Sequence, residues 1–266
     1  MSKGIVTFTT DFGTEDHFVG TMKGVVLGIN PEAALVDICN QVPAFDILQG
    51  AITISQACHY YPAGTVHVVI VDPGVGTSRR PIVADTGKHL FVAPDNGVLS
   101  IVFERQERLT VRHITAEHYF LQPVSKTFHG RDVFAAIAGH LSRGVDISKL
   151  GEPITDYVRL QLPQPAMKEN SILGAVLKID RFGNVITNIT RRMLSQFIGA
   201  HSGSVIIRLN STLIDRFQTT YEEGAPGEPF AIVGSMGYLE IATNKGSAAN
   251  LMGIKPNDVI EVKAVV

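Results

Sequence analysis

The segment TVHVVIV, residues 65–71, is apolar at nearly every position and runs directly into the turn-forming residues DPGVG. A strand that carries apolar side chains on both faces is typical of the centre of a parallel sheet covered by helices. The rest of the first half fits this interpretation, because short β-branched runs alternate there with helical patterns. The sequence therefore predicts an α/β domain built on a mostly parallel sheet.

The individual elements of this domain follow from the same patterns. Apolar residues recur at helical spacing from Phe18 to Ile29, and Pro31 ends that segment. Strands are expected at 4–10, 34–39 and 65–71, a hairpin at 81–85 and 89–92, and further helices at 46–60, 96–104 and 131–142.

The character of the sequence changes near Pro163, where the proline-bearing polar stretch LPQPAMKEN begins. We therefore expect an N-terminal domain over 1–163, a linker over 164–170 and a C-terminal domain over 171–266. Short strand candidates separated by Gly, Asn, Ser and Pro predict a smaller β-barrel or sandwich in the C-terminal domain. These candidates are 172–179, 185–189, 205–209, 230–233, 238–242 and 259–262.

Composition excludes several classes of function. Lys and Arg number 23 against 25 Asp and Glu, so there is no overall positive field to attract nucleic acid or an anionic membrane. No apolar run approaches the roughly 18 residues that a membrane-spanning helix needs. Cys39 and Cys58 lie far apart without CxxC spacing, which favours a reducing cytoplasm and argues against a disulfide framework or a zinc site. Neither a metal nor an organic cofactor is expected.

The strongest local feature is VIVDPGVGTSRR, residues 69–80, where the central strand ends in Asp72 and turns toward Arg79. Open α/β sheets build their sites at the carboxyl ends of strands. Glycines in the turn let backbone amides approach a ligand. The alternative is a surface turn with an exposed ion pair, and the spacing alone does not separate the two.

Two further segments place polar side chains at the ends of elements. His129 precedes an amphipathic helix, whose positive N-terminal end favours the neutral imidazole, although a simple capping role is the alternative. Asp11 and Asp16 follow the first strand in TTDFGTED, where carboxylates suit ribose hydroxyls, a cation or a helix start. In the C-terminal domain, polar side chains that can bind a purine or an amino acid lie in two loops, with hairpin turns as the alternative; they are Asp180, Asn184, Ser235, Glu240 and Asn244.

Six motifs occur in order along nearly the whole chain: DFGTxD, VDPGVGTxRR, APDNG, TFHGRDVF, IDRFGNVxTNI and SxGYLEIAxN. Together they resemble the S-adenosylmethionine (SAM) hydroxide adenosyltransferases, the hydrolytic relatives of fluorinase and chlorinase. The resemblance implies an N-terminal α/β domain, a C-terminal β-barrel, and a homotrimer whose sites lie between one subunit's N-terminal domain and its neighbour's C-terminal domain.

The resemblance also implies roles for individual residues. Asp72, Arg79 and His129 are the expected catalytic triad. The expected substrate contacts are Asp11 to the ribose hydroxyls, Asp16 and Asp180 near the methionine portion, and Asn184, Ser235 and Glu240 at further positions. In the halogenating relatives a tyrosine stands at the position of Asp72 and a serine at that of Gly130, so water is the expected nucleophile here.

The expected activity is thus hydrolysis of SAM to adenosine and L-methionine by attack of water or hydroxide at the ribose C5′ carbon. Two alternatives remain open from the sequence. One is a halide-using synthase of 5′-halo-5′-deoxyadenosine, against which Asp72 and Gly130 argue. The other is a binding or sensing protein for adenosine or SAM that performs no chemistry, since a fold does not guarantee an activity.

Overall fold

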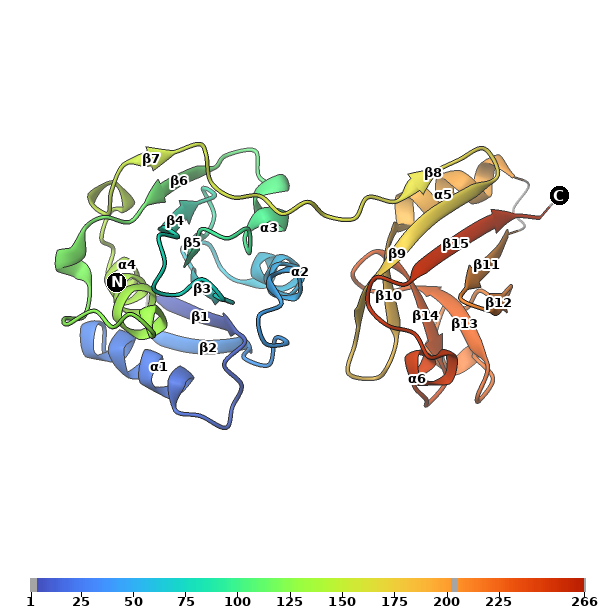
Figure 1. Ribbon diagram of the computed structural model, residues 1–266, viewed down its shortest axis with the longest axis horizontal. Helices are drawn as coiled ribbons and strands as arrows, with labels where there is room; N and C mark the ends of the chain where they lie inside the picture. Colours follow the sequence, from blue (N-terminus) through green and yellow to red (C-terminus); the bar gives the residue numbers. More distant parts are fainter. Residues whose placement is uncertain (1–3, 202–204, 266) are drawn as a thin grey trace. The chain divides into compact units, whose positions relative to one another are not determined.

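The computed structural model describes residues 4–201 and 205–265. Its contacts divide the chain into two compact units, Met1–Leu160 and Gln161–Val266 (Figure 1). The N-terminal unit is an α/β structure and the C-terminal unit is a β-barrel.

The N-terminal unit is built on one mixed sheet in the order β2-β1-β3-β5-β4-β6-β7. Strands β2, β1, β3 and β5 pair in parallel, and the pairs from β5 out to β7 are antiparallel. The predicted mostly parallel α/β class is confirmed. The strands are β1 (Ile5–Thr10), β2 (Ala34–Cys39), β3 (Val66–Ile70), β4 (Pro81–Asp85), β5 (Leu90–Pro94), β6 (Thr110–His113) and β7 (Pro153–Ile154).

Helices cover both faces of this sheet (Figure 1). Helices α1 (Phe18–Ile29) and α4 (Ala136–Ser142) pack on one face, and α2 (Ile47–Ala57) and α3 (Ser100–Glu104) pack on the other. Consecutive residues of β3 therefore enter opposite cores: Val68 belongs to the first apolar cluster and Val69 to the second. This double burial is the reason for the unbroken apolar run in the sequence.

Three predicted helices differ from the observed ones at their ends. The helix expected at 46–60 is α2 followed by a 3₁₀ turn, Cys58–Tyr60, and Asp46 caps α2 by accepting a hydrogen bond from the Gln49 N–H. The helix expected at 96–104 begins only at Ser100, because Gly97 has φ +92°. The helix expected at 131–142 begins with π-helical turns over Gly130–Ala135 before α4. Shorter 3₁₀ turns cover Glu117–Tyr119 and Ile147–Lys149.

The C-terminal unit is an antiparallel, nearly closed barrel in the order β12-β11-β15-β9-β10-β14-β13, with β8 beside β9. After β12 the chain returns to β13, where Arg216 and Gln218 share backbone hydrogen bonds with Ala231 and bring the two edges together. The predicted barrel is confirmed. Its strands are β8 (Ala166–Met167), β9 (Ser171–Ile179), β10 (Val185–Thr190), β11 (Val205–Leu209), β12 (Thr212–Ile214), β13 (Pro229–Val233), β14 (Tyr238–Thr243) and β15 (Val259–Ala264).

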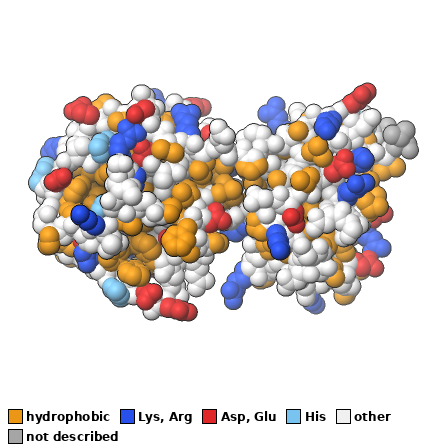
Figure 2. All heavy atoms as spheres, viewed as in Figure 1, with side chains coloured by type: hydrophobic (Ala, Val, Ile, Leu, Met, Phe, Trp, Pro, Cys, Tyr) orange, Lys and Arg blue, Asp and Glu red, His pale blue; other side chains and the backbone are white. Residues whose placement is uncertain are grey.

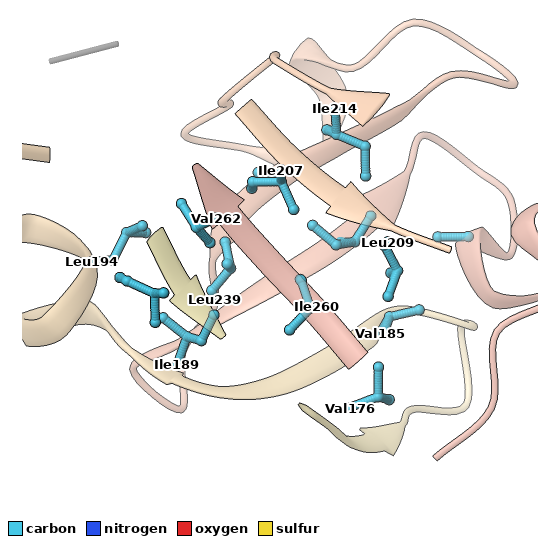
Figure 3. Packing of buried hydrophobic residues seen from close by; sticks show 14 of the residues in the cluster. Val176, Val185, Ile189, Leu194, Ile207, Leu209, Ile214, Leu239, Ile260 and Val262 are labelled. Atoms are coloured by element: carbon cyan, nitrogen blue, oxygen red, sulfur yellow. The ribbon is translucent and has the colours of Figure 1, made fainter. Parts of the chain in front are cut away.

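The barrel interior is filled by aliphatic side chains from its strands, such as Ile207, Leu239 and Ile260 (Figure 3). Helix α5 (Arg191–Ala200), which the sequence reading did not predict, closes one side of this core with Leu194 and Phe197. A short helix α6 (Ala248–Met252) and a 3₁₀ turn (Tyr221–Glu223) complete the unit.

On the face drawn in Figure 2, acidic and basic side chains are interspersed over both units. This pattern agrees with the nearly balanced charge of the chain. None of the helices in the described residues is long and apolar enough to cross a lipid bilayer.

Candidate active site

The turn that follows β3 folds back on itself through short-range hydrogen bonds. The Val75 N–H donates to the carbonyl oxygen of Asp72, and the Thr77 N–H and hydroxyl both donate to that of Gly74. Gly76 has φ +76° and lies so close to the Lys126 carbonyl group that a side chain at this position would collide with it. The turn thus brings Arg79 back toward Asp72 and seats the loop against the segment that carries His129.

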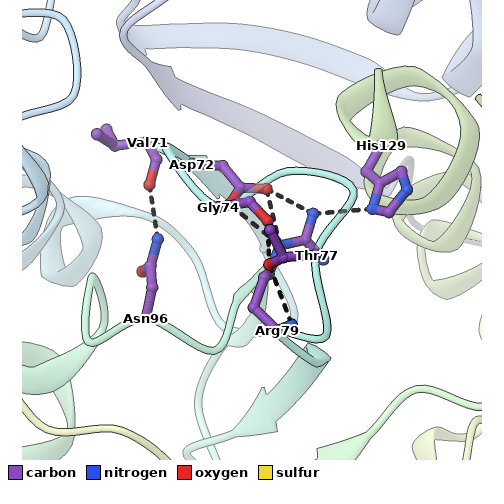
Figure 4. Close-up of polar contacts among 7 residues, drawn as sticks. All are labelled: Val71, Asp72, Gly74, Thr77, Arg79, Asn96 and His129. Carbon is purple, nitrogen blue, oxygen red and sulfur yellow. Dashed lines mark hydrogen bonds and ion pairs between the residues drawn. The ribbon is translucent and has the colours of Figure 1, made fainter. Parts of the chain in front are cut away.

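Arg79 lies between Asp72 and His129 and binds both (Figure 4). Its Nε donates to the two carboxylate oxygens of Asp72 at 3.0 and 2.9 Å, and its Nη2 donates to Asp72 Oδ2 and approaches His129 Nδ1 at 2.9 Å. The side chains of Arg79 and Asp72 are only 8% and 5% exposed. The structure therefore contradicts the alternative of an exposed surface ion pair.

The contact with Arg79 determines how His129 carries its proton. A guanidinium group only donates hydrogen bonds, so His129 Nδ1 is the acceptor and the neutral ring carries its proton on Nε2. Burial lowers the pKa of His129, and the positive charge of Arg79 lowers it further, which favours this neutral form. His129 can therefore offer an Nε2–H donor to a ligand.

The APDNG motif stabilises the start of this turn through a side-chain hydrogen bond. Asn96 Nδ2 donates to the Val71 carbonyl oxygen at 2.8 Å and fixes the residue that precedes Asp72 (Figure 4). Arg80, the next residue, forms ion pairs with Asp95 and Asp156 instead. The two adjacent arginines therefore have different functions: Arg79 binds Asp72 and His129, and Arg80 anchors the loop.

A cavity of about 110 Å³ opens beside the triad, with Asp72 and His129 in its wall. The rest of the wall is mainly apolar, and three of its rings pack on one another; they are Phe12, Phe18 and Phe128. Gly130 also lines the cavity, and a Cβ atom there would lie only 3.1–3.2 Å from Phe128, Met22 and Phe12. Asp72 and His129 thus face a small, mainly apolar space.

Asp11 directly precedes Phe12, which lines this cavity, and Asp16 is exposed in the segment before α1. Asp11 Oδ2 accepts a hydrogen bond from the Phe45 N–H at 2.9 Å. Burial raises the pKa of Asp11, and the nearby Asp72 carboxylate adds to the rise. Asp11 and Asp72 therefore belong to one neighbourhood.

Phe45 is a residue of this neighbourhood that the sequence reading missed. It has φ +67°, a strained conformation for a bulky side chain, and the residue is 71% exposed. The available signal was an aromatic residue directly before Asp46, the N-cap of α2. Its backbone holds Asp11 while its ring faces solvent, so it is a further candidate for ligand contact.

Three of the predicted site residues of the C-terminal unit, Asp180, Asn184 and Ser235, line a second cavity, of about 710 Å³. Asp180 is fixed there by its own loop: Asp180 Oδ1 accepts from the backbone N–H groups of Phe182 and Asn184, and Oδ2 accepts from the Asn184 side chain at 2.9 Å.

Glu240 is placed differently from these residues. It lies on β14, is 4% exposed, and accepts a hydrogen bond from the Tyr221 hydroxyl at 3.1 Å. Tyr221, Phe182 and Lys245 line the cavity and were not predicted. No sequence motif indicated Lys245 as a site residue. Its position depends on a left-handed backbone conformation, φ +53°, which arises only in the folded loop.

Within residues 4–201 and 205–265, no group of three or more His, Cys, Asp or Glu side chains is arranged to hold a metal ion. The N-terminal unit brings together a guanidinium, a carboxylate and an imidazole, and the C-terminal unit offers a cavity lined by both polar and aromatic side chains.

Comparison with known families covers both units. Residues 6–151 match the SAM hydroxide adenosyltransferase N-terminal domain, and residues 174–261 match the corresponding C-terminal domain.

Individual relatives match over nearly their full lengths. An (R)-S-adenosyl-L-methionine hydrolase from Salinispora tropica is 35% identical over 268 residues, which cover 97% of each chain. A fluorinase from Nocardia brasiliensis is 27% identical over 97% of this chain and 96% of its own. The crystal structure of an uncharacterized conserved protein from Thermotoga maritima superimposes with a TM-score of 0.89 at 35% identity, covering 97% of this chain and 99% of that one.

Proposed function

Because the chain belongs to the SAM hydroxide adenosyltransferase family, which is related to fluorinase, we propose that it hydrolyses SAM to adenosine and L-methionine. The observation that carries this proposal is the buried hydrogen-bonded set of Asp72, Arg79 and His129 at the carboxyl end of β3. The proposed N-terminal domain, 1–163, carries this catalytic set. The proposed C-terminal domain, 171–266, contributes ligand contacts.

The reaction is an in-line displacement at the ribose C5′ carbon. A bond forms between C5′ and the oxygen of hydroxide, or of water that releases one proton to solvent as it attacks. The bond between C5′ and the sulfonium sulfur breaks, and its electron pair remains on the sulfur of methionine. The leaving group is a neutral thioether, so it needs no acid. When hydroxide attacks the C5′ carbon of the sulfonium substrate, the negative charge of hydroxide and the positive charge of sulfur both diminish in the transition state. A site that excludes water favours this loss of charge. The small, mainly apolar cavity beside Asp72 supports this environment.

Arg79 is the centre of the proposed catalytic set. Its charge stabilises an anionic oxygen at the cavity, and its hydrogen bonds hold Asp72 and His129 in fixed positions. The Nε2–H of His129 donates to the attacking oxygen, and Asp72 accepts from its O–H group. Both carboxylate oxygens of Asp72 already accept hydrogen bonds from Arg79, so we favour stabilised hydroxide over proton abstraction by Asp72.

The substrate contacts are assigned by the same proposal. Asp11 holds the ribose hydroxyl groups, and Asp16 and Asp180 lie near the methionine portion. Asn184, Ser235 and Glu240 belong to the C-terminal part of the site. The gathering of Asp180, Asn184 and Ser235 around one cavity supports their grouping.

We also propose a homotrimer in which each site lies between the N-terminal domain of one subunit and the C-terminal domain of its neighbour. The expected ligand contacts are divided between the two units, with Asp11 and Asp16 in the N-terminal one and Asp180, Asn184 and Ser235 in the C-terminal one, so a complete site needs both. Sedimentation equilibrium should give the mass of three chains; a monomer that turns over SAM would contradict the shared site.

The free thiols of Cys39 and Cys58 support a cytoplasmic location.

Incubation with SAM in oxygen-18 water, with and without excess chloride, tests the reaction. Adenosine that carries the label at its 5′ oxygen, in a yield independent of chloride, is the expected product by mass spectrometry. Chlorinated product would assign the protein to the halide-using class. Tight binding of adenosine or SAM without turnover would assign it to the sensing class.

A further inference from the structure

The Glu240 carboxyl group is enclosed within the C-terminal unit. Its residue is 4% exposed, and its oxygens lie against Gly234, where any side chain would collide with them. The hydroxyl group of Tyr221 donates to Glu240 Oε2 at 3.1 Å. The carboxyl group is therefore held between the Gly234 backbone and the Tyr221 phenol.

Tyr221 connects this buried group to the cavity. It lines the cavity of about 710 Å³ together with Asp180, Asn184 and Phe182, and it is itself 45% exposed. Tyr221 lies in a single 3₁₀ turn on the surface of the barrel, so its ring depends on tertiary contacts for its orientation. The bond to Glu240 supplies such a contact from the rigid strand β14.

The electrostatics of the pair agree with a mutual contact. Burial raises the pKa of Glu240, and the nearby Asp180 carboxylate raises it further. Burial, together with the Glu240 charge and hydrogen bond, raises the pKa of Tyr221 to about 12, so the phenol keeps its proton and remains a donor. A buried carboxyl group needs such a donor, because burying it without a hydrogen bond costs free energy.

We propose that Glu240 is a positioning residue, which acts through its hydrogen bond to Tyr221 and holds the phenol ring as a wall of the C-terminal cavity. This inference deepens the proposed function and rests on it for the identity of the ligand, whose adenosyl part supplies a flat aromatic group for an aromatic wall. It replaces the expected direct contact between Glu240 and the substrate with an indirect one.

The coupling can be measured without any substrate. Protein labelled with 3-fluorotyrosine gives a fluorine NMR signal for Tyr221, which is assigned by its loss in Tyr221→Phe. We expect Glu240→Ala to shift and narrow this signal, because the ring gains freedom, and Glu240→Gln to keep it near its original position, because the amide oxygen still accepts the bond. A Tyr221 signal unchanged in Glu240→Ala would overturn the proposal. Glu240→Gln and Tyr221→Phe remain usable if Glu240→Ala does not fold.

A double-mutant cycle on adenosine binding separates positioning from direct contact. We expect Glu240→Ala to weaken binding about tenfold in the native background and less than twofold in the Tyr221→Phe background, with KM affected more than kcat. Equal losses in both backgrounds would show direct contact and overturn the proposal. Glu222→Ala, which removes a neighbouring carboxylate of the same turn, is the matched control.

The two measurements keep this inference apart from the proposed function. A protein that does not turn over SAM but shows the expected NMR shift and binding cycle would contradict hydrolysis and leave the positioning role standing. A protein that hydrolyses SAM, but in which the binding losses of Glu240→Ala and Tyr221→Phe simply add, would support the proposed function and contradict the positioning role.

Discussion

Replacing Arg79 with alanine should lower kcat for SAM hydrolysis by about a thousandfold or more, which corresponds to about 4 kcal/mol of transition-state stabilisation. The guanidinium bonds Asp72 and His129 at once, so its removal takes away the charge that stabilises an anionic oxygen and the contact that fixes the histidine tautomer. Substrate binding should persist, because the cavities and the other contacts remain. Single-turnover kinetics and calorimetric binding of SAM measure the two effects separately.

Two variants serve as comparisons for Arg79→Ala. Arg79→Lys keeps a positive charge but loses the planar fork that bonds both partners, so it should recover little of the rate. Arg80→Ala removes the adjacent arginine, which binds Asp95 and Asp156, and should leave most of kcat intact. An Arg79→Ala protein that retains a tenth or more of the native rate would remove Arg79 from the centre of the mechanism.

The N-terminal unit should lose about 2 kcal/mol of stability when the pH falls from 6.5 to 4.5, through His67 alone. His67 on β3 is fully buried, its Nδ1 bonds the Thr7 hydroxyl at 2.7 Å, and its Nε2 has no partner among the described residues. Burial, with a further contribution from His89, lowers the pKa of His67 to about 3.

The direction of this pH dependence follows from how many protons the folded and unfolded states bind. Between pH 6.5 and about 3 the unfolded chain binds a proton that folded His67 does not, so the loss approaches about 1.4 kcal/mol for each further unit of pH once the pH is well below 6.5. The stability contribution is fully present above pH 6.5. Urea unfolding at a series of pH values, followed by a signal from the N-terminal unit, measures the slope.

His67→Gln is the variant that tests this assignment. Glutamine remains neutral and can still hydrogen-bond Thr7, so the variant should show a flatter dependence of unfolding free energy on pH between 6.5 and 4.5. The same replacement at the exposed His17 controls for the loss of a histidine as such. An unchanged slope in His67→Gln would show that other groups cause the acid sensitivity.

Local patterns were enough to predict most elements of both units. The strands at 34–39 and 205–209 have the predicted ends, because hydrophobic periodicity and turn residues act within a few positions of one another. Helix α5 was missed although Thr190 caps it and Leu194 and Phe197 lie on one face. Its short apolar stripe becomes distinctive only when the barrel core that it covers is known.

The sequence predicted which residues belong to the candidate site but not how those residues are arranged. The order of six motifs identified Asp72, Arg79 and His129, and a strand end followed by glycines indicated where they meet. No sequence pattern gives the bidentate contact of Arg79 with Asp72 or the acceptor role of His129 Nδ1. Those contacts join residues up to 50 positions apart, and their geometry is set by how the turn after β3 packs against the segment before α4.

By itself, then, the sequence determined the α/β class, the barrel, the family and the identity of the candidate residues, because periodicity, turn chemistry and motif order are local or linear properties. Only the tertiary structure decided which of those residues face a cavity and which support a neighbour. Glu240 shows the difference, because its burial against Gly234 and its bond to Tyr221 arise from strand pairing and loop packing. Such contacts depend on distances between residues remote in sequence, and a linear pattern carries no record of them.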